Sequence, residues 1–382
     1  MVSKIGDRAF SVCTNLEKVS MGDNLTSIST SSFNSCTSLI EFAISEKNEV
    51  FSAVDGVLVN KDKTVLVLFP FGKSADVTIP SGIKVIGERV FADNESIKKI
   101  TIPDHVTTIL SEAFMNCINL HSVILNNHMD SIGPNAFQGC KKLTSIELPE
   151  NLSHIADSVF LECTALESIN IPDGVMTIGV SAFEHCESMK NLTLGSGVTT
   201  IGDRAFIGCL GLIQIVIPDN VIVIGNFSFY YSGARILTIG ANVAEIGENA
   251  FGYMYGLGRI NNRNPVPITV GYLFSNIPHN GYPPMYVPVG SGEAYKASSS
   301  WNYLEIYELE DVANEIVSDK IAITQANGVI SISSAEPSNV AIFTMSGQMV
   351  YQQSASNQHK ISLSRGFYFI KANQTTKKVF VE

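Results

Sequence analysis

The chain has 382 residues, of which 45% are hydrophobic and 16% are charged, and this balance excludes a disordered polypeptide. Its net charge of −11 argues against a general binder of nucleic acid or of anionic membranes, because these partners carry the same sign of charge. No apolar stretch is long enough to predict a transmembrane helix.

A 23-residue unit with the consensus V-x-x-I-G-x-x-A-F-x-x-C-x-x-L-x-x-I-x-I-P-x-x recurs from the first residues to about residue 260. Phenylalanines mark its register, since they follow each other at steps of 23 residues from Phe91 to Phe229. A fixed period of this length predicts a solenoid, in which stacked coils share one core. Because the repeat is already under way at Met1 and no signal peptide precedes it, we expect a secretion signal to have been removed from this chain.

Each unit predicts two short strands. The segment Leu143–Leu148 has a period of two, which predicts a strand with Ile146 and Leu148 buried and Glu147 exposed. The segment 198–202 predicts a second short strand or an extended turn. Stacking of such units places identical apolar residues above one another in columns.

The end of the second strand predicts a tight change of direction. Gly202 is expected to have a positive φ angle, which glycine adopts without steric cost. Ala205 and Phe206 indicate a short helical turn or a β-arc that directs Phe206 and Cys209 into the core. The predicted fold class is therefore a repeat solenoid that is rich in β-structure and has short helical turns.

The period breaks once, because Phe33 and Phe91 are 58 residues apart. The extra segment, about 46–77, contains Val57–Val59 and Thr64–Leu68 on either side of a four-residue polar turn. This pattern predicts a β-hairpin. We expect the segment to pack on the solenoid of residues 1–260 as an insertion.

Beyond residue 260 the composition changes twice. Residues 261–310 are rich in proline and are expected to cap the last coil, and Ala294–Trp301 predicts a short helix that carries the only tryptophan. Residues 313–382 contain seven short apolar segments separated by turn residues, which predicts a small antiparallel β-sandwich domain. The predicted strands are Ile321–Ile323, Val329–Ile332, Val340–Phe343, Met349–Tyr351, Lys360–Leu363, Phe367–Ile370 and Lys378–Val381.

The repeat unit resembles the BspA-type (Treponema-like) leucine-rich repeat over about residues 2–260. The positions that carry this resemblance in one coil are Ile132, Gly133, Ala136, Phe137, Cys140, Leu143, Ile146, Leu148 and Pro149. The resemblance implies a leucine-rich-repeat solenoid in a secreted or cell-surface protein of anaerobic bacteria or certain protists. It further implies adhesion or host-protein binding, and it supplies no catalytic motif.

Residues 313–382 resemble the C-terminal sorting-type β-domain of Bacteroidetes secreted proteins. The resemblance rests on Gly328–Ile332, Val340–Gly347, Ile361–Tyr368 and Lys377–Val379. It implies an extracellular or cell-surface location. Phe343, Thr344 and Met345 replace the usual aromatic residue and polar turn, so both a working secretion signal and a retained structural module stay open.

The cysteines all occupy one position of the repeat. Their spacing of 23 residues lacks the C-x-x-C pairs of zinc sites, and their odd number argues against a disulfide framework. We therefore predict a buried column of unpaired thiols, formed by Cys13, Cys36, Cys117, Cys140, Cys163, Cys186 and Cys209. The seven histidines show no metal-binding motif and no repeat register, so no metal, cofactor or catalytic residue is predicted.

The outward positions of the L-x-x-I-x-I strands are the remaining candidates for function. They form either an ordinary sheet face, with residues suited to strands, or a binding face for an extended partner. The candidate partner-binding residues are Lys99, Thr101, Ile124, Glu147, Asn170, Asn191, Thr193, Gln214, Val216 and Ile236.

Three functions are compatible with the sequence, and it favours them in the order given. The first is a non-enzymatic, adhesin-like protein of the cell surface or extracellular space that binds a protein or glycan partner. The second is a structural spacer or scaffold on the cell surface. The third is a secreted hydrolase with a site in the insertion or the cap, where no set of acid, base and nucleophile is visible.

Overall fold

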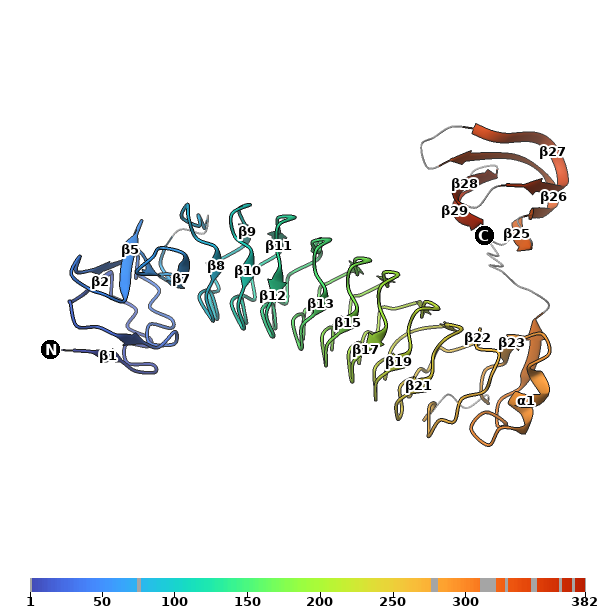
Figure 1. Ribbon diagram of the computed structural model, residues 1–382, viewed down its shortest axis with the longest axis horizontal. Helices are drawn as coiled ribbons and strands as arrows, with labels where there is room; N and C mark the ends of the chain where they lie inside the picture. Colours follow the sequence, from blue (N-terminus) through green and yellow to red (C-terminus); the bar gives the residue numbers. More distant parts are fainter. Residues whose placement is uncertain are drawn as a thin grey trace. The chain divides into compact units, whose positions relative to one another are not determined.

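The computed structural model describes residues 2–73, 77–275, 281–309, 321–326, 329–344, 349–363, 366–372 and 375–381. The chain divides into two compact units (Figure 1). The solenoid unit comprises Met1–Val287 and Ser291–Tyr307, and the C-terminal unit comprises Pro288–Gly290 and Glu308–Glu382. The solenoid unit therefore holds the repeats and most of the residues predicted to cap them.

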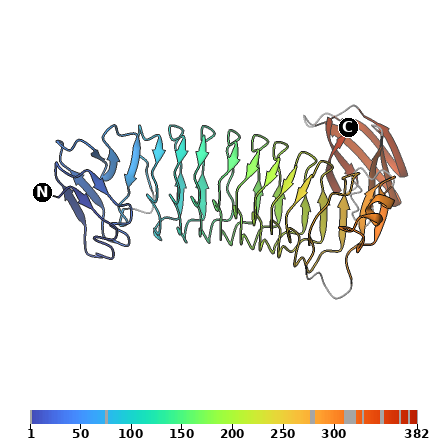
Figure 2. The same ribbon diagram turned by 60° about the horizontal axis from the view of Figure 1, so that its bottom comes forward.

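Successive coils of the solenoid place their short strands side by side in two rows of parallel strands (Figure 2). The first strand row comes from the L-x-x-I-x-I segments and contains β2 (Lys18–Met21), β4 (Glu41–Ile44), β9 (Lys99–Thr101), β11 (Ser122–Ile124), β14 (Ser168–Asn170), β16 (Asn191–Thr193), β18 (Gln214–Val216), β20 (Ile236–Ile239) and β22 (Arg259–Asn262). The second strand row comes from the V-x-x-I segments and contains β1 (Lys4–Ile5), β3 (Ser27–Ile28), β8 (Val85–Ile86), β10 (Thr108–Ile109), β12 (Ser131–Ile132), β13 (His154–Ile155), β15 (Thr177–Ile178), β17 (Thr200–Ile201), β19 (Val223–Ile224) and β21 (Glu245–Ile246). The register equals one repeat, as with Ile169 opposite Leu192, so equivalent residues form columns.

The predicted strand at Leu143–Leu148 is not formed, although its side chains alternate as predicted. Ile146 and Leu148 are buried, and Glu147 is exposed. The N–H group of Glu167 donates to the carbonyl oxygen of Thr144 at 3.0 Å. Within the described part of the chain, this segment forms no further backbone hydrogen bonds of the kind that make a parallel ladder with the neighbouring coil. This coil is therefore extended without being a strand.

The predicted short helical turn is also not formed, and a series of tight turns takes its place. Glu112 and Asn116, on either side of Phe114, have φ angles of 58° and 57°, which a right-handed helix does not allow. The N–H groups of Phe114 and Asn116 donate to the next coil, to the carbonyl oxygens of Ala136 at 2.8 Å and Gln138 at 2.7 Å. Bonds between coils thus shape the I-G-x-x-A-F-x-x-C segments, which we call the turn edge.

Gly202 does not have the predicted positive φ angle, which belongs instead to Arg204, at 59°. Glycine is favoured at this position because successive coils approach each other closely. A Cβ atom on Gly202 would lie 2.8 Å from the carbonyl carbon of Gly179 and 2.8 Å from the carbonyl oxygen of Ile178. The close approach of two backbones, rather than a left-handed conformation, therefore selects glycine here.

This explanation predicts that Gly225→Ala destabilises the solenoid unit by about 1–3 kcal/mol, the usual cost of overpacking. A Cβ atom on Gly225 would lie 2.5 Å from both the backbone nitrogen and the Oδ1 atom of Asp203. Gly6→Ala is the matched control, because Gly6 has the same repeat position and no atom within 4 Å of its ideal Cβ. Urea unfolding measures both variants, and equal losses of free energy would contradict the explanation.

An aromatic column runs through the core of the solenoid. Neighbouring rings of the column from Phe91 to Phe251 stack at centroid distances of 4.9–5.9 Å. The insertion contributes Phe69, which packs on Phe91 at 5.0 Å, and Phe274 continues the column beyond Phe251 at 5.8 Å. Residues outside the regular repeats therefore extend the same core.

The insertion adds three antiparallel strands to the second strand row. The predicted hairpin consists of β6 (Val57–Asn60) and β7 (Val65–Leu68), and an additional strand, β5 (Phe51–Val54), pairs with β6. Strand β7 then pairs in parallel with β8. The insertion thus takes the place beside β8 that an uninterrupted repeat would give to β3.

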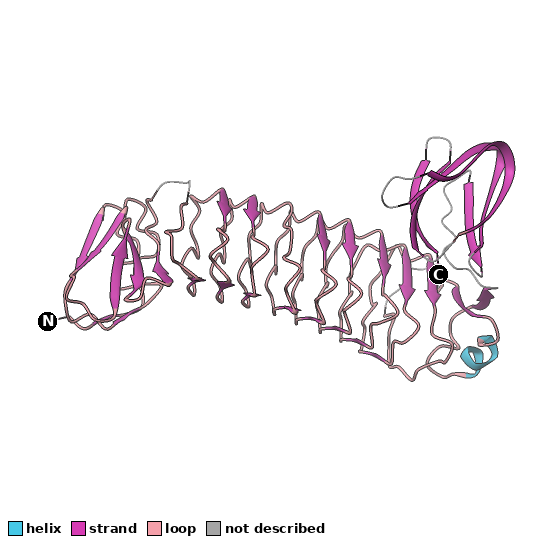
Figure 3. Cartoon of the chain, turned by 45° about the horizontal axis from the view of Figure 1, so that its top comes forward, coloured by secondary structure: helices cyan, strands magenta, loops and turns pink. Residues whose placement is uncertain are grey.

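The region after the last repeat contains β23 (Met285–Pro288), α1 (Gly292–Ala297) and β24 (Ile306–Leu309). The predicted helix is shorter than expected, because the backbone becomes extended at Ser298, before Trp301 (Figure 3). Tyr295 and Trp301 are fully buried and pack edge to face at 5.8 Å. Trp301 Nε1 donates to the carbonyl oxygen of Ile268 at 2.8 Å, so the indole nitrogen is satisfied inside the core.

The C-terminal unit contains one antiparallel sheet of β25 (Ile321–Ala326), β26 (Val329–Thr344), β27 (Met349–Ser362), β28 (Gly366–Ala372) and β29 (Thr375–Val381). Strand β26 pairs with β27 along its length and with β25 and β28 at its two ends. Five strands replace the seven predicted, because β26 and β27 each join two predicted segments through register shifts between Ser333 and Val340. The antiparallel strands are as predicted, and the sandwich of two sheets stays a prediction.

Candidate functional site

The first strand row turns one side of each strand toward solvent, and we call this surface the strand face. Outward residues one coil apart are register partners, as with Asn170 opposite Thr193 and Gln214 opposite Ile236. Nine of the ten candidate partner-binding residues are exposed: Lys99, Thr101, Ile124, Glu147, Asn170, Asn191, Thr193, Gln214 and Val216. Their side chains stand at the spacing of the coils, about 4.8 Å for hydrogen-bonded strands.

The strand face is mostly polar, and its charges are partly paired. Ile124 and Val216 are exposed apolar residues, at 57% and 43%. Lys18 Nζ lies 2.8 Å from Glu41 Oε2, and this hydrogen bond together with the charge of Glu41 raises the pKa of Lys18. Such pairs leave amide and hydroxyl groups as the main polar contacts that the face offers.

The outward residues of the strand face become buried toward its C-terminal end. Ile236 is half-buried rather than exposed, and Thr238, the next outward residue of its strand, is buried. Asn261 Nδ2 donates to the hydroxyl of Thr238 at 3.4 Å. Arg259 lies over the ring of Tyr286, with its Cζ atom 4.1 Å from the ring centroid. The interpretation of Ile236 as an exposed contact is therefore wrong.

The strand face also contains Arg259, Asn261 and Tyr286, which the repeat pattern did not predict. The strand register places Arg259 opposite Ile236 and Asn261 opposite Tyr286. The sequence does contain one indication that the strand row continues here. Leu257 and Ile260 keep the L-x-x-I spacing of the repeat after the other consensus residues have disappeared.

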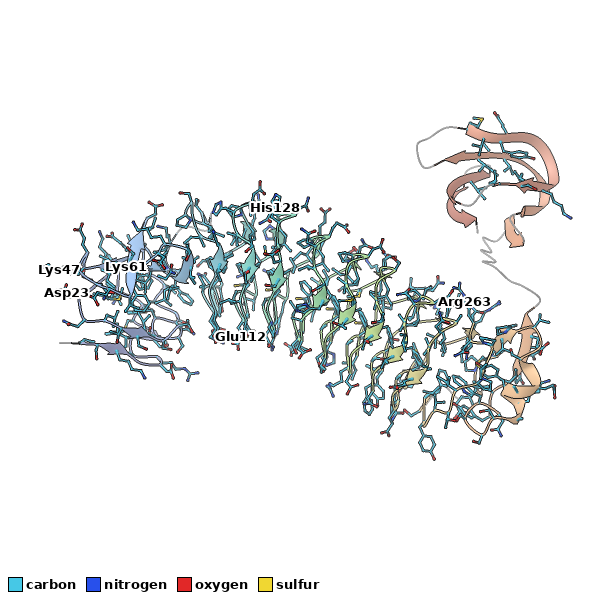
Figure 4. All side chains as sticks on the ribbon, in the orientation of Figure 1. Asp23, Lys47, Lys61, Glu112, His128 and Arg263 are labelled. Carbon is cyan, nitrogen blue, oxygen red and sulfur yellow. The ribbon has the colours of Figure 1, made fainter. Side chains whose placement is uncertain are left out.

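Ion pairs connect adjacent coils on the turn edge, the side of the solenoid on which Figure 4 labels Glu112. Arg204 donates to Glu184 through Nε at 3.1 Å and through Nη2 at 2.6 Å. Burial alone would raise the pKa of Glu184, but hydrogen bonds from Arg204 and Ser181 and the charge of Arg204 hold it below its ordinary value. Arg89 forms a single contact with Glu112, from Nη1 to Oε2, between two other coils. These pairs hold neighbouring turns together.

A cleft of about 950 Å³ opens where the insertion separates the coil of Phe33 from that of Phe91. Its lining residues are Lys4, Ile5, Gly6, Asp7, Arg8, Ser27, Ile28, Ser29, Thr30, Ser31, Asn34, Glu88, Arg89 and Asp93. Asn34 Nδ2 donates to Asp93 Oδ2 at 3.1 Å, and Arg89 Nη2 lies 3.2 Å from the same oxygen. The bond from Asn34 joins the two coils across the cleft, and Arg89 holds the Asp93 carboxylate from within the same coil.

Six of the seven cysteines are buried in the predicted column, and Cys13 is exposed in the first coil. Each buried thiol donates to the carbonyl oxygen of the phenylalanine one coil earlier, at 3.0–3.3 Å, as Cys163 does to Phe137. Burial raises the pKa of Cys163 to about 12. These thiols are therefore structural hydrogen-bond donors, and their protonated state suits the core.

The histidines whose side chains the structure describes do not gather into a site. The five with described side chains are all exposed: His105, His121, His128, His154 and His185. His279 lies outside the described residues. Across the described part of the chain, no group of three or more His, Cys, Asp or Glu residues could hold a metal ion. No described helix is long and apolar enough to cross a membrane.

Comparison with known families assigns both parts of the chain. The BspA type leucine rich repeat region matches in six copies, over residues 1–54, 69–190 and 153–279. The gap between the first two ranges contains β6 and β7 of the insertion. The secretion system C-terminal sorting domain matches residues 326–382.

Solved structures of two leucine-rich repeat proteins are similar to this chain. A leucine-rich repeat protein from Eubacterium ventriosum is 25% identical with a TM-score of 0.52, and the match covers 56% of this chain and 59% of that protein. A leucine-rich repeat protein from Bacteroides ovatus is 23% identical with a TM-score of 0.43, and the match covers 81% of this chain and 88% of that protein. No curated protein sequence matches the chain.

Proposed function

The chain belongs to the BspA type leucine rich repeat family, and from this premise we propose that it is a non-enzymatic protein of the cell surface or extracellular space that binds a protein or glycan partner. The observation that supports this proposal is the strand face, where exposed side chains of successive coils stand in register. An extended partner would contact several coils at once, so that individually weak contacts add up along the solenoid.

Two further observations support this location and role. The C-terminal match is to a secretion system sorting domain, and neither matched family is a family of enzymes. Outside the cell, exposed thiols tend to form disulfides, but burial protects six of the seven cysteines of this chain from exchange. The solenoid is therefore compatible with an oxidising environment without containing a disulfide framework.

A triple variant of the strand face tests the proposal. Wild-type protein is screened against an array of soluble glycans and a panel of purified extracellular proteins. Any ligand found should bind at least about tenfold more weakly to the variant Asn170→Ala/Thr193→Ala/Gln214→Ala. The matched control is Met176→Ala/Ile222→Ala, which changes two exposed residues beside the second strand row and should leave the affinity unchanged. A wild-type protein that binds nothing in either screen, or an equal loss in the control, would count against this face.

A structural spacer is the second candidate function, and the continuous aromatic column favours it because stacked coils form a stiff rod. Deleting residues 175–197 removes one whole coil and shortens the rod without changing the columns. If this deletion abolishes a surface phenotype that the strand-face variant leaves intact, the spacer function is the better description.

A further inference from the structure

Five aromatic side chains form one connected cluster on the turn edge of two adjacent coils, and we call it the tyrosine patch. Phe227 packs on Tyr230 with ring centroids 5.4 Å apart, and Tyr230 packs on Tyr253 at 4.9 Å. Tyr255 contacts both Tyr253, at 5.8 Å, and Tyr231, at 5.9 Å. Tyr255 and Tyr231 are 54% and 43% exposed, and the other three rings are half-buried.

Folding does not account for aromatic residues at these positions. Phe227, Tyr231 and Tyr253 have φ angles of 55°, 57° and 57°, a conformation that bulky side chains disfavour. They stand two residues before or after the core phenylalanine of their coil. In the coils from Phe91 to Phe206, these positions carry only polar residues or glycine. The aromatic residues therefore depart from the pattern at a cost in backbone energy and without being fully buried.

A glycine in the next coil, Gly252, lies against the ring of Tyr230. Gly252 follows the core residue Phe251, and a Cβ atom on it would lie 2.7 Å from Ser275 Oγ and 2.9 Å and 3.0 Å from Cδ2 and Cε2 of Tyr230. Other coils carry side chains at this position, such as Met115 and Gln138. A ring on one coil is thus matched by a missing side chain on the next, and the ring lies across both coils.

Amide and carboxylate groups adjoin the patch. The N–H group of Phe227 donates to the carbonyl oxygen of Glu248 at 2.9 Å, so the backbones of these two residues lie side by side, and Glu248 is exposed. The backbone N–H group of Glu248 donates to Asn226 Oδ1 at 2.8 Å, and Asn226 Nδ2 donates to the carboxylate of Asp203 at 3.2 Å, so this amide is already engaged. Arg204, in the coil before Phe227, is engaged by Glu184. The groups available for hydrogen bonding beside the rings are therefore neutral or acidic.

We propose that the tyrosine patch binds a neutral oligosaccharide. The C–H face of a sugar ring is apolar and slightly positive, which complements the negative face of an aromatic ring. A sugar hydroxyl group can donate to the carboxylate of Glu248, which is an exposed residue. Edge-to-face contacts fix the rings before a ligand arrives, which limits the entropy lost on binding.

A folded protein partner matches the patch less well. A standard interface buries about 800 Å² on each partner. The patch covers two coils, or about 10 Å of the solenoid axis at the spacing of paired strands. The net charge of −11 also disfavours acidic glycans. Because the patch lies on the turn edge and not on the strand face, it is a second surface, independent of the one proposed above.

Titration with neutral oligosaccharides tests the proposal. The probes are hexasaccharides of β-linked glucose, xylose, mannose and N-acetylglucosamine and of α-linked glucose, and binding is followed by NMR of the intact chain. At least one probe should bind, and the variant Tyr231→Ser/Tyr255→Ser should lower its affinity at least about tenfold. The variant Tyr231→Phe/Tyr255→Phe keeps the rings and should bind within about threefold of wild type.

Several outcomes would overturn the proposal. They are the absence of any signal change at about 10 mM of every probe, equal affinity of the serine variant, and binding confined to proteins or charged polymers. The strand-face variant separates the two surfaces, because it should retain full affinity for the oligosaccharide. Loss of binding in that variant, with retention in the serine variant, would assign the sugar to the strand face. Thermal unfolding of both tyrosine variants, whose mutated residues are exposed, checks that they are folded.

Discussion

Replacing Phe183 with alanine should lower the free energy of unfolding of the solenoid unit by about 3–5 kcal/mol. Phe183 is fully buried and stacks on Phe160 at 5.3 Å and on Phe206 at 5.1 Å. Alanine would remove both contacts and leave a cavity. The coils cannot close this cavity, because backbone bonds such as that from the N–H group of Phe183 to the carbonyl oxygen of Ala205 hold them at a fixed spacing. The stability of a solenoid is approximately the sum of the contributions of its coils and of the interfaces between neighbouring coils. Because Phe183 contacts the coils on both sides, the variant weakens two interfaces at once.

Phe10→Ala is the matched control for this variant. Phe10 has the same repeat position in the first coil, is 43% exposed and stacks on Phe33 at 5.2 Å. Its removal should cost less than about 1.5 kcal/mol, because less apolar surface returns to water. Unfolding in guanidinium chloride, followed by circular dichroism and by the fluorescence of Trp301, measures both variants. Equal losses would show that burial within the column does not determine stability.

The buried columns could be predicted from the sequence because the solenoid repeats one environment. Phe160, Cys163 and Ile169 each lie next to an equivalent residue one coil away, so the period alone identifies their partners. Alternation within the L-x-x-I-x-I segment likewise identified the exposed side, as Glu147 shows. Position within the repeat therefore reports burial reliably wherever the repeat is regular.

The backbone of the turn edge could not be predicted, because its partners are distant in sequence. The pattern around Ala113 and Phe114 is compatible with a helical turn, yet the N–H group of Phe114 bonds to Ala136 in the next coil. Gly202 has the same difficulty, since its constraint is the backbone of Gly179 one coil earlier. A consensus sequence shows which residues are needed, but not which neighbouring backbone requires them.

The two candidate surfaces differ in how visible they are in the sequence. The strand face follows from strand alternation, but its closure at Ile236 depends on Arg259 and Asn261, where the repeat degenerates. The tyrosine patch arises from residues that break their columns, namely Phe227 and Tyr231, and a search for consensus residues passes over such departures. In a repeat protein, the consensus describes the fold, and departures from it at exposed positions are the better signal of function.

Alkaline conditions should destabilise the solenoid through its thiol column. Burial raises the pKa of Cys163 from an ordinary value of 9.0 to about 12, and it raises those of Cys117, Cys140 and Cys186 as well. The core excludes a thiolate that the unfolded chain forms freely. The stability from a raised acid pKa is complete below pH 9 and is lost as the pH approaches about 12. Each pH unit in this window removes up to about 1.4 kcal/mol per thiol.

Cys163→Ala isolates the contribution of one thiol. At neutral pH the variant should be about 1 kcal/mol less stable than wild type, because it loses the bond from Cys163 Sγ to the carbonyl oxygen of Phe137, at 3.2 Å. Above pH 9 ionisation of this thiol in the unfolded chain destabilises the wild type but not the variant. The difference in free energy of unfolding between the two proteins should therefore shrink and reverse at about pH 10. Gly225→Ala, which leaves every thiol in place, should keep a constant difference from wild type. Urea unfolding of the three proteins at several pH values measures these differences. A pH-independent difference for Cys163→Ala would show that its thiol is not held protonated by the core.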